Sequence, residues 1–165
     1  MAHVSVREMN DDDWPAVRDI YQEGIATGNA TFQTVPPEWQ EWDSSHLREC
    51  RYVAYTENGV LGWAALSAYS QRHAYRGVAE LSIYVAARCQ GSGVGKALLS
   101  ELIRGSESAG FWTLIAGIFP ENRASISLHL VQGFREVGCR EKVGEMHGVW
   151  RDVLIFERRS HAVCY

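Results

Sequence analysis

The chain has 165 residues, of which 46% are hydrophobic and 22% are charged, and its formal net charge is -4. These values are typical of an ordinary globular domain. We therefore expect one domain over residues 1–159 and a short tail over residues 160–165. The 16 basic residues are outnumbered by 20 acidic ones and form no basic run, which argues against a protein that binds nucleic acid or a membrane surface.

The cysteines and the N-terminus indicate the cell compartment. The cysteines lie far apart and form no C-x-x-C pair, at Cys50, Cys89, Cys139 and Cys164. This spacing predicts neither a metal site nor a redox motif. We expect the four thiols to be reduced, which favours the cytoplasm as the compartment. The first residues lack the apolar core of a signal peptide, and no apolar run reaches the roughly 18 residues of a membrane span.

In chain order, the first predicted elements are a strand over residues 3–8 and a helix capped by Asn10 or Asp11. The apolar face of this helix has five residues at helical spacing, namely Trp14, Val17, Ile20, Tyr21 and Ile25. Pro36-Pro37 predicts the start of a second helix, because proline is tolerated at the first helical position. This second helix is expected to carry Trp39, Trp42 and Leu47.

Three strands are predicted next, over residues 51–55, 60–68 and 78–85. The first two are joined by Glu57-Asn58-Gly59, where Asn-Gly predicts a hairpin turn with positive φ angles. A glycine-rich turn follows the third strand. A helix then has apolar positions at Val94, Leu98, Leu99, Leu102 and Ile103.

The last predicted elements are a strand over residues 111–119, a helix over residues 124–132 and two strands over residues 134–143 and 149–156. Pro120 ends the first of these strands and Gly133 ends the helix. The full order is β-α-α-β-β-β-α-β-α-β-β. It predicts an α/β (α+β) fold in which helices cover a mixed sheet.

The glycine-rich turn reads Gln90-Gly91-Ser92-Gly93-Val94-Gly95-Lys96 and lies between a predicted strand and a predicted helix. Glycines let the backbone approach a ligand closely, and N–H groups at a helix start bind anions, so the turn predicts a phosphate site. A plain connection between strand and helix is the alternative. A Walker A loop does not fit, because Gln90 and Ala97 stand where it needs Gly and Ser or Thr, and G-x-G-x-x-G fails at Lys96.

The turn does match Q-x-x-G-x-G, and at this point the chain resembles the GNAT superfamily of acetyl-CoA-dependent N-acetyltransferases. A second matching segment runs from Asn122 to His129 and is followed by Gly133-Phe134. Five motifs resemble the phosphinothricin and methionine sulfoximine acetyltransferase branch: Thr31-Phe32, Pro36-Pro37, Arg72-His73-Ala74-Tyr75-Arg76, Glu80-Leu81-Ser82-Ile83-Tyr84-Val85 and Gly148-Val149-Trp150-Arg151-Asp152-Val153. The resemblance implies a mostly antiparallel central sheet flanked by about four helices, with acetyl-CoA as co-substrate and a homodimer as the assembly.

The resemblance also implies a cofactor site built from a strand, the turn and the second segment. Pantetheine would lie along the strand at Ile83, Tyr84 and Val85. The pyrophosphate would lie on the turn, at Gln90, Gly91, Ser92, Gly93, Val94, Gly95 and Lys96. Asn122 and Ser125 would contact the cofactor from the second segment. Asn122 is also a suitable N-cap for the helix that follows, and the two roles can coexist.

Glu80 is the predicted general base. Strand alternation places Glu80, Ser82 and Tyr84 on one face of a strand that we expect to be largely buried. Burial of a carboxylate raises its pKa toward a value that suits a base. A structural ion pair between Glu80 and Arg72 or Arg76 is the alternative.

The remaining candidates follow from the resemblance. His129 stands where many family members have a tyrosine that protonates the leaving thiolate, which implies a general acid. A hydrogen-bonded core histidine is the alternative. The guanidinium groups of Arg72 and Arg76 are suited to bind an anionic group of the acceptor. For Arg76, the alternative is a side chain that is simply solvated at the surface. Phe32 and Tyr75 would line the acceptor pocket.

The favoured function is acetylation of the α-amino group of a small amino acid or of a toxic analogue of the phosphinothricin or methionine sulfoximine type. Members that act on these analogues often have a basic residue two positions before Arg72, where this chain has Ser70, so the acceptor stays open. Two alternatives remain. One is a non-catalytic acyl-CoA sensor, which would need no base at Glu80, and the other is an N-acetyltransferase of proteins or peptides.

Overall fold

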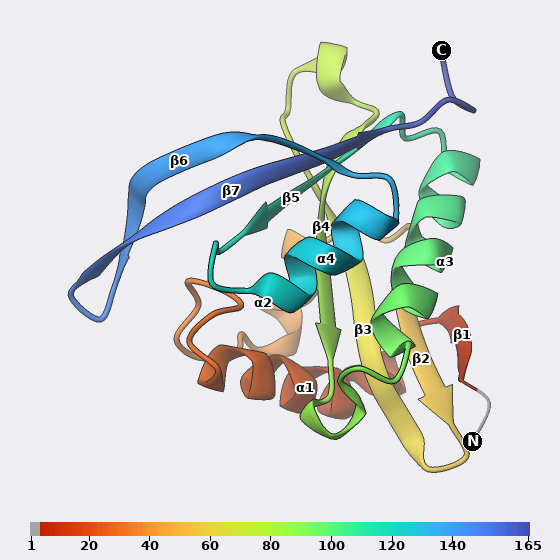
Figure 1. The fold of residues 1–165 in the computed structure, drawn as a ribbon. Coiled ribbons are helices and arrows are strands. Elements are labelled where there is room, and N and C mark those ends of the chain that lie inside the picture. Colours follow the sequence, from red (N-terminus) through yellow and green to blue (C-terminus); the bar gives the residue numbers. More distant parts are fainter. Residues whose placement is uncertain (1–3) are drawn as a thin grey trace.

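The computed structural model describes residues 4–165, and its centre is a sheet of seven strands in the order β1-β2-β3-β4-β5-β7-β6 (Figure 1). All neighbouring strands are antiparallel except β4 and β5. The strands are β1 Ser5–Glu8, β2 Tyr52–Thr56, β3 Gly59–Ala68, β4 Val78–Val85, β5 Thr113–Ile118, β6 Arg135–Met146 and β7 Val149–Arg159. The helices are α1 Trp14–Ala26, α2 Trp39–Ser45, α3 Val94–Ser108 and α4 Arg123–Val131. The predicted fold class and order of elements are confirmed.

Several predicted boundaries are wrong near the N-terminal half. The predicted strand begins at His3, which lies outside the described residues. Helix α2 begins at Trp39 rather than at Pro36, because Glu38 has an extended backbone with φ -76° and ψ 163°. In the hairpin between β2 and β3, only Gly59 of the Asn-Gly pair has a positive φ, at 109°, and Gly59 already belongs to β3.

The β6–β7 hairpin is longer than predicted, because β6 continues to Met146 and β7 continues to Arg159. Met146 pairs with Val149, so His147 and Gly148 form a two-residue turn. Both have positive φ, 52° and 78°, which matches the right-handed twist of a hairpin. The predicted strand end at Val143 is wrong, because β6 passes through a bulge at residues 141–143 and then pairs with β7 up to Met146. In Figure 1 the hairpin is the long blue arm that extends beyond the rest of the sheet.

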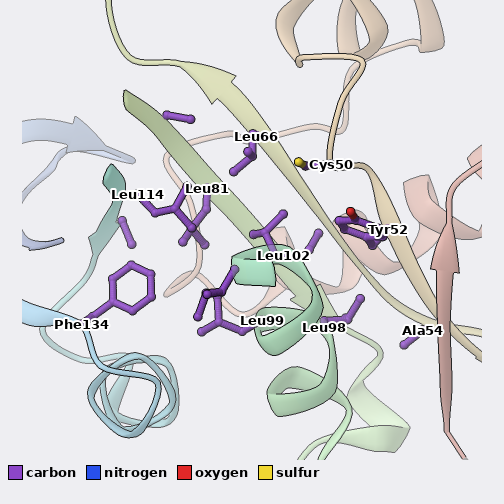
Figure 2. Packing of buried hydrophobic residues seen from close by; sticks show 14 of the residues in the cluster. Cys50, Tyr52, Ala54, Leu66, Leu81, Leu98, Leu99, Leu102, Leu114 and Phe134 are labelled. Carbon is purple, nitrogen blue, oxygen red and sulfur yellow. The ribbon is translucent and has the colours of Figure 1, made fainter. Parts of the chain in front are cut away.

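The core lies on both faces of the sheet, because successive strand residues point to opposite sides. Helix α3 packs on one face, where Leu98, Leu99 and Leu102 have no exposed area and meet strand residues that include Leu66 and Leu81 (Figure 2). Burying each of these leucines stabilises the fold by about 2 kcal/mol.

The opposite face of the sheet is covered by α1 and α2. It holds a second cluster of buried residues, namely Val17, Ile20, Trp42, Val53, Trp63, Ala65 and Ala86.

Strands β4 and β5 separate soon after they meet. They pair only between Val78–Glu80 and Thr113–Ile115, and Figure 1 shows β5 diverging from β4 beyond this point. The remainder of β4, from Leu81 to Val85, keeps its pairing with β3 on the other side. The sheet therefore has a gap between β4 and β5, and the backbone of each strand borders this gap without a partner strand.

The residues after Arg159 form no helix or strand, but this part of the described chain is held in place. The Arg159 side chain donates hydrogen bonds to the carbonyl oxygens of Ser160, Val163 and Cys164 at 2.6, 2.9 and 2.7 Å. Within residues 4–165, no helix combines the length and the apolar character needed to span a membrane.

Candidate active site

The gap between β4 and β5 opens into a cavity of about 650 Å³. From the α1 side it is lined by Tyr21, Phe32, Glu80 and Tyr84. From the α4 side it is lined by Asn122, Ser125 and His129, and α4 packs against the same core cluster as α3 through Ile126 and Leu128. The cavity therefore connects the two faces of the sheet, so that two reactants approaching from opposite faces can meet inside it.

Glu80 lies where β4 and β5 separate. Its backbone is opposite Ser67 of β3 and Ile115 of β5. The expectation of a buried side chain is wrong, since the carboxylate is exposed to the open cavity. The surrounding protein nevertheless desolvates the carboxylate and raises its pKa above the usual value, while the charge of Arg140 acts in the opposite direction. Among the described residues, neither Arg72 nor Arg76 forms an ion pair with it.

The edge of β4 along the gap offers backbone hydrogen bonds. The carbonyl oxygen of Val78 accepts from Tyr69 N at 3.4 Å, and Ala86 N donates to the carbonyl oxygen of Leu61 at 2.8 Å, so the even-numbered residues turn their backbone groups toward β3. The odd-numbered residues Ile83 and Val85 then turn theirs toward the gap. Such an edge suits an extended amide chain such as pantetheine, which can pair as an added strand does. Tyr84 contributes its side chain to the cavity instead.

The glycine-rich turn leads into α3. Gly93 is the N-cap residue, with φ 88° and ψ -2°, and Gly91 has φ 75°, a conformation that favours glycine. In the described part of the chain, the backbone N–H groups of residues 93–96 have no hydrogen-bond acceptor. Four unpaired N–H groups at the start of a 15-residue helix suit a phosphate group. Residues 90–96 do not line the cavity itself and are separated from the end of β4 by Ala86 and the short helix Ala87–Cys89.

His129 is buried, with 1% of its surface exposed. Its Nδ1 lies 2.7 Å from the carbonyl oxygen of Ser125, and since a carbonyl only accepts, Nδ1 carries the proton. Burial lowers the pKa of the imidazole, so the ring is neutral near pH 7 and Nε2 holds a lone pair. Nε2 is buried and has no hydrogen-bond partner among the described residues. In this state His129 accepts a hydrogen bond and does not donate one at Nε2, so the implied acid role requires prior protonation.

Asn122 and Ser125 lie at the start of α4. The Asn122 side-chain oxygen accepts from Ser125 N at 3.2 Å, which is the N-cap arrangement given as one of the two roles. The side-chain amide of Asn122 donates to the carbonyl oxygen of Asn29 at 3.2 Å. Both residues line the cavity. The structure therefore brings them to the site, and their contact with a cofactor stays a prediction.

The loop after α1 lines part of the cavity and is held by Arg151. This guanidinium donates to the carbonyl oxygen of Gly28 and to Asn29 Oδ1, both at 2.9 Å. It also pairs with Glu121 at 3.2 Å and lies 4.2 Å from the centre of the Phe119 ring. The loop carries Phe32, whose ring packs edge-on against Phe119 at 4.9 Å. Arg151 thus fixes the loop that places Phe32 in the cavity wall.

Three predicted acceptor residues do not line the cavity. Arg72, Tyr75 and Arg76 lie in or beside the short helix His73–Tyr75. Arg76 covers the Trp112 ring at 5.2 Å and donates to the carbonyl oxygen of His73. Tyr75 packs edge-on against Tyr69, with ring centres 5.7 Å apart, and Tyr69 does line the cavity. Of these three residues, Tyr75 therefore contacts a residue of the cavity wall without lining the cavity itself.

Three residues that the sequence does not single out for the site also line the cavity, namely Tyr21, Tyr69 and Arg140. Tyr21 is part of the apolar face of α1, so its pattern indicates only packing. Arg140 belongs to β6, which reaches the site because it pairs with β7. Both strands are far from Glu80 in the sequence, so no local pattern connects Arg140 with Glu80. Within residues 4–165, no group of three or more His, Cys, Asp or Glu side chains is arranged to hold a metal ion.

Comparisons with known proteins agree with this geometry. Residues 5–134 match the Acetyltransferase (GNAT) family. The chain is 35% identical over 168 residues to phosphinothricin N-acetyltransferase of Alcaligenes faecalis, with 96% of this chain and 83% of that protein covered. It is 28% identical to the L-methionine sulfoximine/L-methionine sulfone acetyltransferase of Pseudomonas paraeruginosa, with 93% and 92% covered. The crystal structure of a phosphinothricin acetyltransferase from Sinorhizobium meliloti in complex with acetyl-CoA has a TM-score of 0.87 and 34% identity, with 98% of this chain and 90% of that chain covered.

Proposed function

The chain belongs to the acetyltransferase (GNAT) family and is an acetyl-CoA-dependent N-acetyltransferase, and we propose that its acceptor is the α-amino group of a small amino acid or of an analogue of the phosphinothricin or methionine sulfoximine type. The observation that carries this proposal is the cavity in the sheet gap, which Glu80 lines on one side of the sheet and His129 on the other. The names of the relatives with high coverage support the same acceptor class.

The proposed roles follow from the contacts. The unpaired N–H groups of residues 93–96 would hold the pyrophosphate of acetyl-CoA, and the edge of β4 at Ile83 and Val85 would hold its pantetheine. Acetyl-CoA supplies the thioester. Glu80, with its raised pKa, would accept the proton of the acceptor's ammonium group, which leaves the neutral amine needed for attack on the thioester carbonyl. Phe32 would close the acceptor side and exclude water.

The contacts of His129 support a role other than the acid implied by the resemblance. Because Nδ1–H is donated to Ser125 and burial disfavours the charged ring, the resting imidazole offers an acceptor at Nε2. We therefore propose that His129 orients a donor in the cavity through Nε2. It becomes able to release a proton to the thiolate only after taking one at that atom.

The test is release of the CoA thiol from acetyl-CoA over a panel of acceptors: proteinogenic amino acids, L-phosphinothricin, L-methionine sulfoximine, L-methionine sulfone, polyamines and a peptide with a free N-terminus. We expect turnover with amino acids or the analogues, and a product that carries one acetyl group on the α-nitrogen by mass spectrometry. Turnover with only the peptide or polyamines would refute the amino-acid acceptor. Tight acetyl-CoA binding without turnover on any acceptor would support a sensor instead.

We also propose a cytoplasmic homodimer. The resemblance implies the dimer, and the exposed apolar residues on the β6–β7 arm support it, namely Val137, Val143, Val149 and Trp150. Four free cysteines without a disulfide among the described residues fit a reducing compartment. Analytical ultracentrifugation tests the dimer: a single species of twice the 18.5 kDa chain mass is expected, and a monomer at micromolar concentration would refute it.

A further inference from the structure

Arg140 of β6 is placed in the wall of the cavity that also holds Glu80. Its cross-strand partner is Val153 of β7, and directly opposed residues of an antiparallel pair share a face of the sheet. Arg140 and Val153 both line the cavity. The arginine side chain therefore extends from the arm toward the acceptor part of the site.

A bulge in β6 begins directly after Arg140. The pairing shifts from Arg140 opposite Val153 to Gly144 opposite Arg151, so three residues of β6 face one residue of β7. Lys142 in the bulge has φ 46°, and its N–H donates to Asp152 Oδ1 at 2.8 Å. Bulges re-aim side chains beside active sites. This one also brings Val143 and Gly144 to the cavity wall, where Gly144 leaves room for the Phe32 ring.

The Arg140 guanidinium has no hydrogen bond or ion pair within residues 4–165. Other arginines of the protein do have such partners: Arg7 pairs with Asp13 at 2.7 Å and Arg51 pairs with Asp43 at 2.6 Å. Arg140 is near enough to Glu80 for its charge to lower the pKa of that carboxyl, yet the two side chains form no ion pair. An unpaired cation and an unpaired carboxylate thus border one cavity, with space between them.

We propose that Arg140 binds the α-carboxylate of the acceptor while Glu80 faces its α-ammonium group, so that Arg140 selects amino acids over amines that lack an anion. The proposal rests on the proposed function and deepens it. An amino acid carries its ammonium and carboxylate groups on the same α-carbon, and the opposite charges of Arg140 and Glu80 at one cavity match that arrangement. A guanidinium binds a carboxylate through two parallel N–H groups. Arg72 does not line the cavity and is assigned no contact with this group.

The experiment compares L-methionine sulfone with its α-carboxamide as acceptors of wild-type protein and of Arg140→Met, which removes the charge and keeps the length of the side chain. With wild type, we expect KM to be lower for the acid than for the amide. Arg140→Met should raise KM for the acid roughly 10- to 100-fold, the range for a lost charge-assisted hydrogen bond. KM for the amide and KM for acetyl-CoA should stay within about twofold.

Two further variants control the test. Arg135→Met changes an arginine of the same strand that is paired with Glu157 and lies outside the cavity, and it should leave the KM ratio of acid to amide unchanged. Arg72→Met tests the competing placement of the anion. If Arg72→Met abolishes the preference for the acid and Arg140→Met does not, the inference is wrong. Thermal unfolding of each variant shows whether the fold is retained.

The outcomes separate this inference from the proposed function. If wild-type protein acetylates no acceptor of the amino-acid class, the proposed acceptor fails and the inference fails with it. If wild-type protein acetylates the acid, but Arg140→Met raises KM equally for the acid and the amide or for neither, the proposed function stands and Arg140 does not read the carboxylate.

Discussion

Replacing Glu80 by glutamine should separate catalysis from stability. Glutamine keeps the size of the side chain and removes its ability to take a proton. Within residues 4–165, Glu80 has no ion pair or hydrogen bond that the change would break, and its side chain is exposed to the cavity. The free energy of unfolding should therefore change by less than about 0.5 kcal/mol. Loss of a general base lowers turnover by roughly 100- to 10,000-fold, and the lower limit corresponds to about 2.7 kcal/mol of activation free energy.

The assay for Glu80→Gln is thiol release under saturating acetyl-CoA, combined with calorimetric binding of acetyl-CoA and urea unfolding. Affinity for acetyl-CoA should be unchanged, because the turn and the β4 edge are untouched. In wild-type protein, activity should fall with decreasing pH as the carboxylate with the raised pKa becomes protonated. Glu80→Asn provides a shortened control that should be equally inactive. A turnover number within fivefold of wild type, or an unchanged pH profile, would refute the role of Glu80 as base.

Three further predictions concern the cofactor turn, the core and pH. Gly93→Val forces a side chain onto a φ of 88° and should abolish acetyl-CoA binding by calorimetry with the fold intact by circular dichroism; normal affinity would remove the turn from the site. Leu102→Ala should lower the free energy of unfolding in urea by about 2–5 kcal/mol, and a loss below 1 kcal/mol would contradict its burial. Burial lowers the pKa values of His46 and His129 below 6.5, so as the pH falls the unfolded chain takes up these protons before the folded chain does. The free energy of unfolding should therefore be fully present above about pH 6.5 and decline below it. Equal stability at pH 7.5 and 5.5 would contradict this.

The periodic parts of the fold were predictable from the sequence. The apolar spacing of α3 and the alternation in β4 are local patterns that tertiary contacts reinforce, and both elements occur where they were predicted. The turn of the β6–β7 hairpin lies within the predicted connection, residues 144–148, but its exact position there was not predictable in the same way. Its signal is His147 followed by Gly148, and histidine is a less usual residue for a positive φ than asparagine.

The site was predictable in part, for a related physical reason. Glu80 and the glycine-rich turn belong to one strand and the helix start beside it, so a short stretch of sequence contains the signal. Arg140 reaches the cavity through the pairing of β6 with β7, a bulge and the gap between β4 and β5, none of which a local pattern reports. The ion pair of Glu80 with Arg72 or Arg76, which was the alternative to a general base at Glu80, is absent from the described chain, and neither arginine lines the cavity.

A crystal structure of the protein with acetyl-CoA and L-methionine sulfone would test the site most directly. The expected result has the pyrophosphate on the N–H groups of residues 93–96, the pantetheine paired with the β4 edge at Ile83 and Val85, and the acceptor nitrogen within hydrogen-bond distance of Glu80. A cofactor bound away from the gap between β4 and β5, or an acceptor nitrogen that faces residues other than Glu80, would contradict the assignment of this cavity as the place where the acetyl group is transferred.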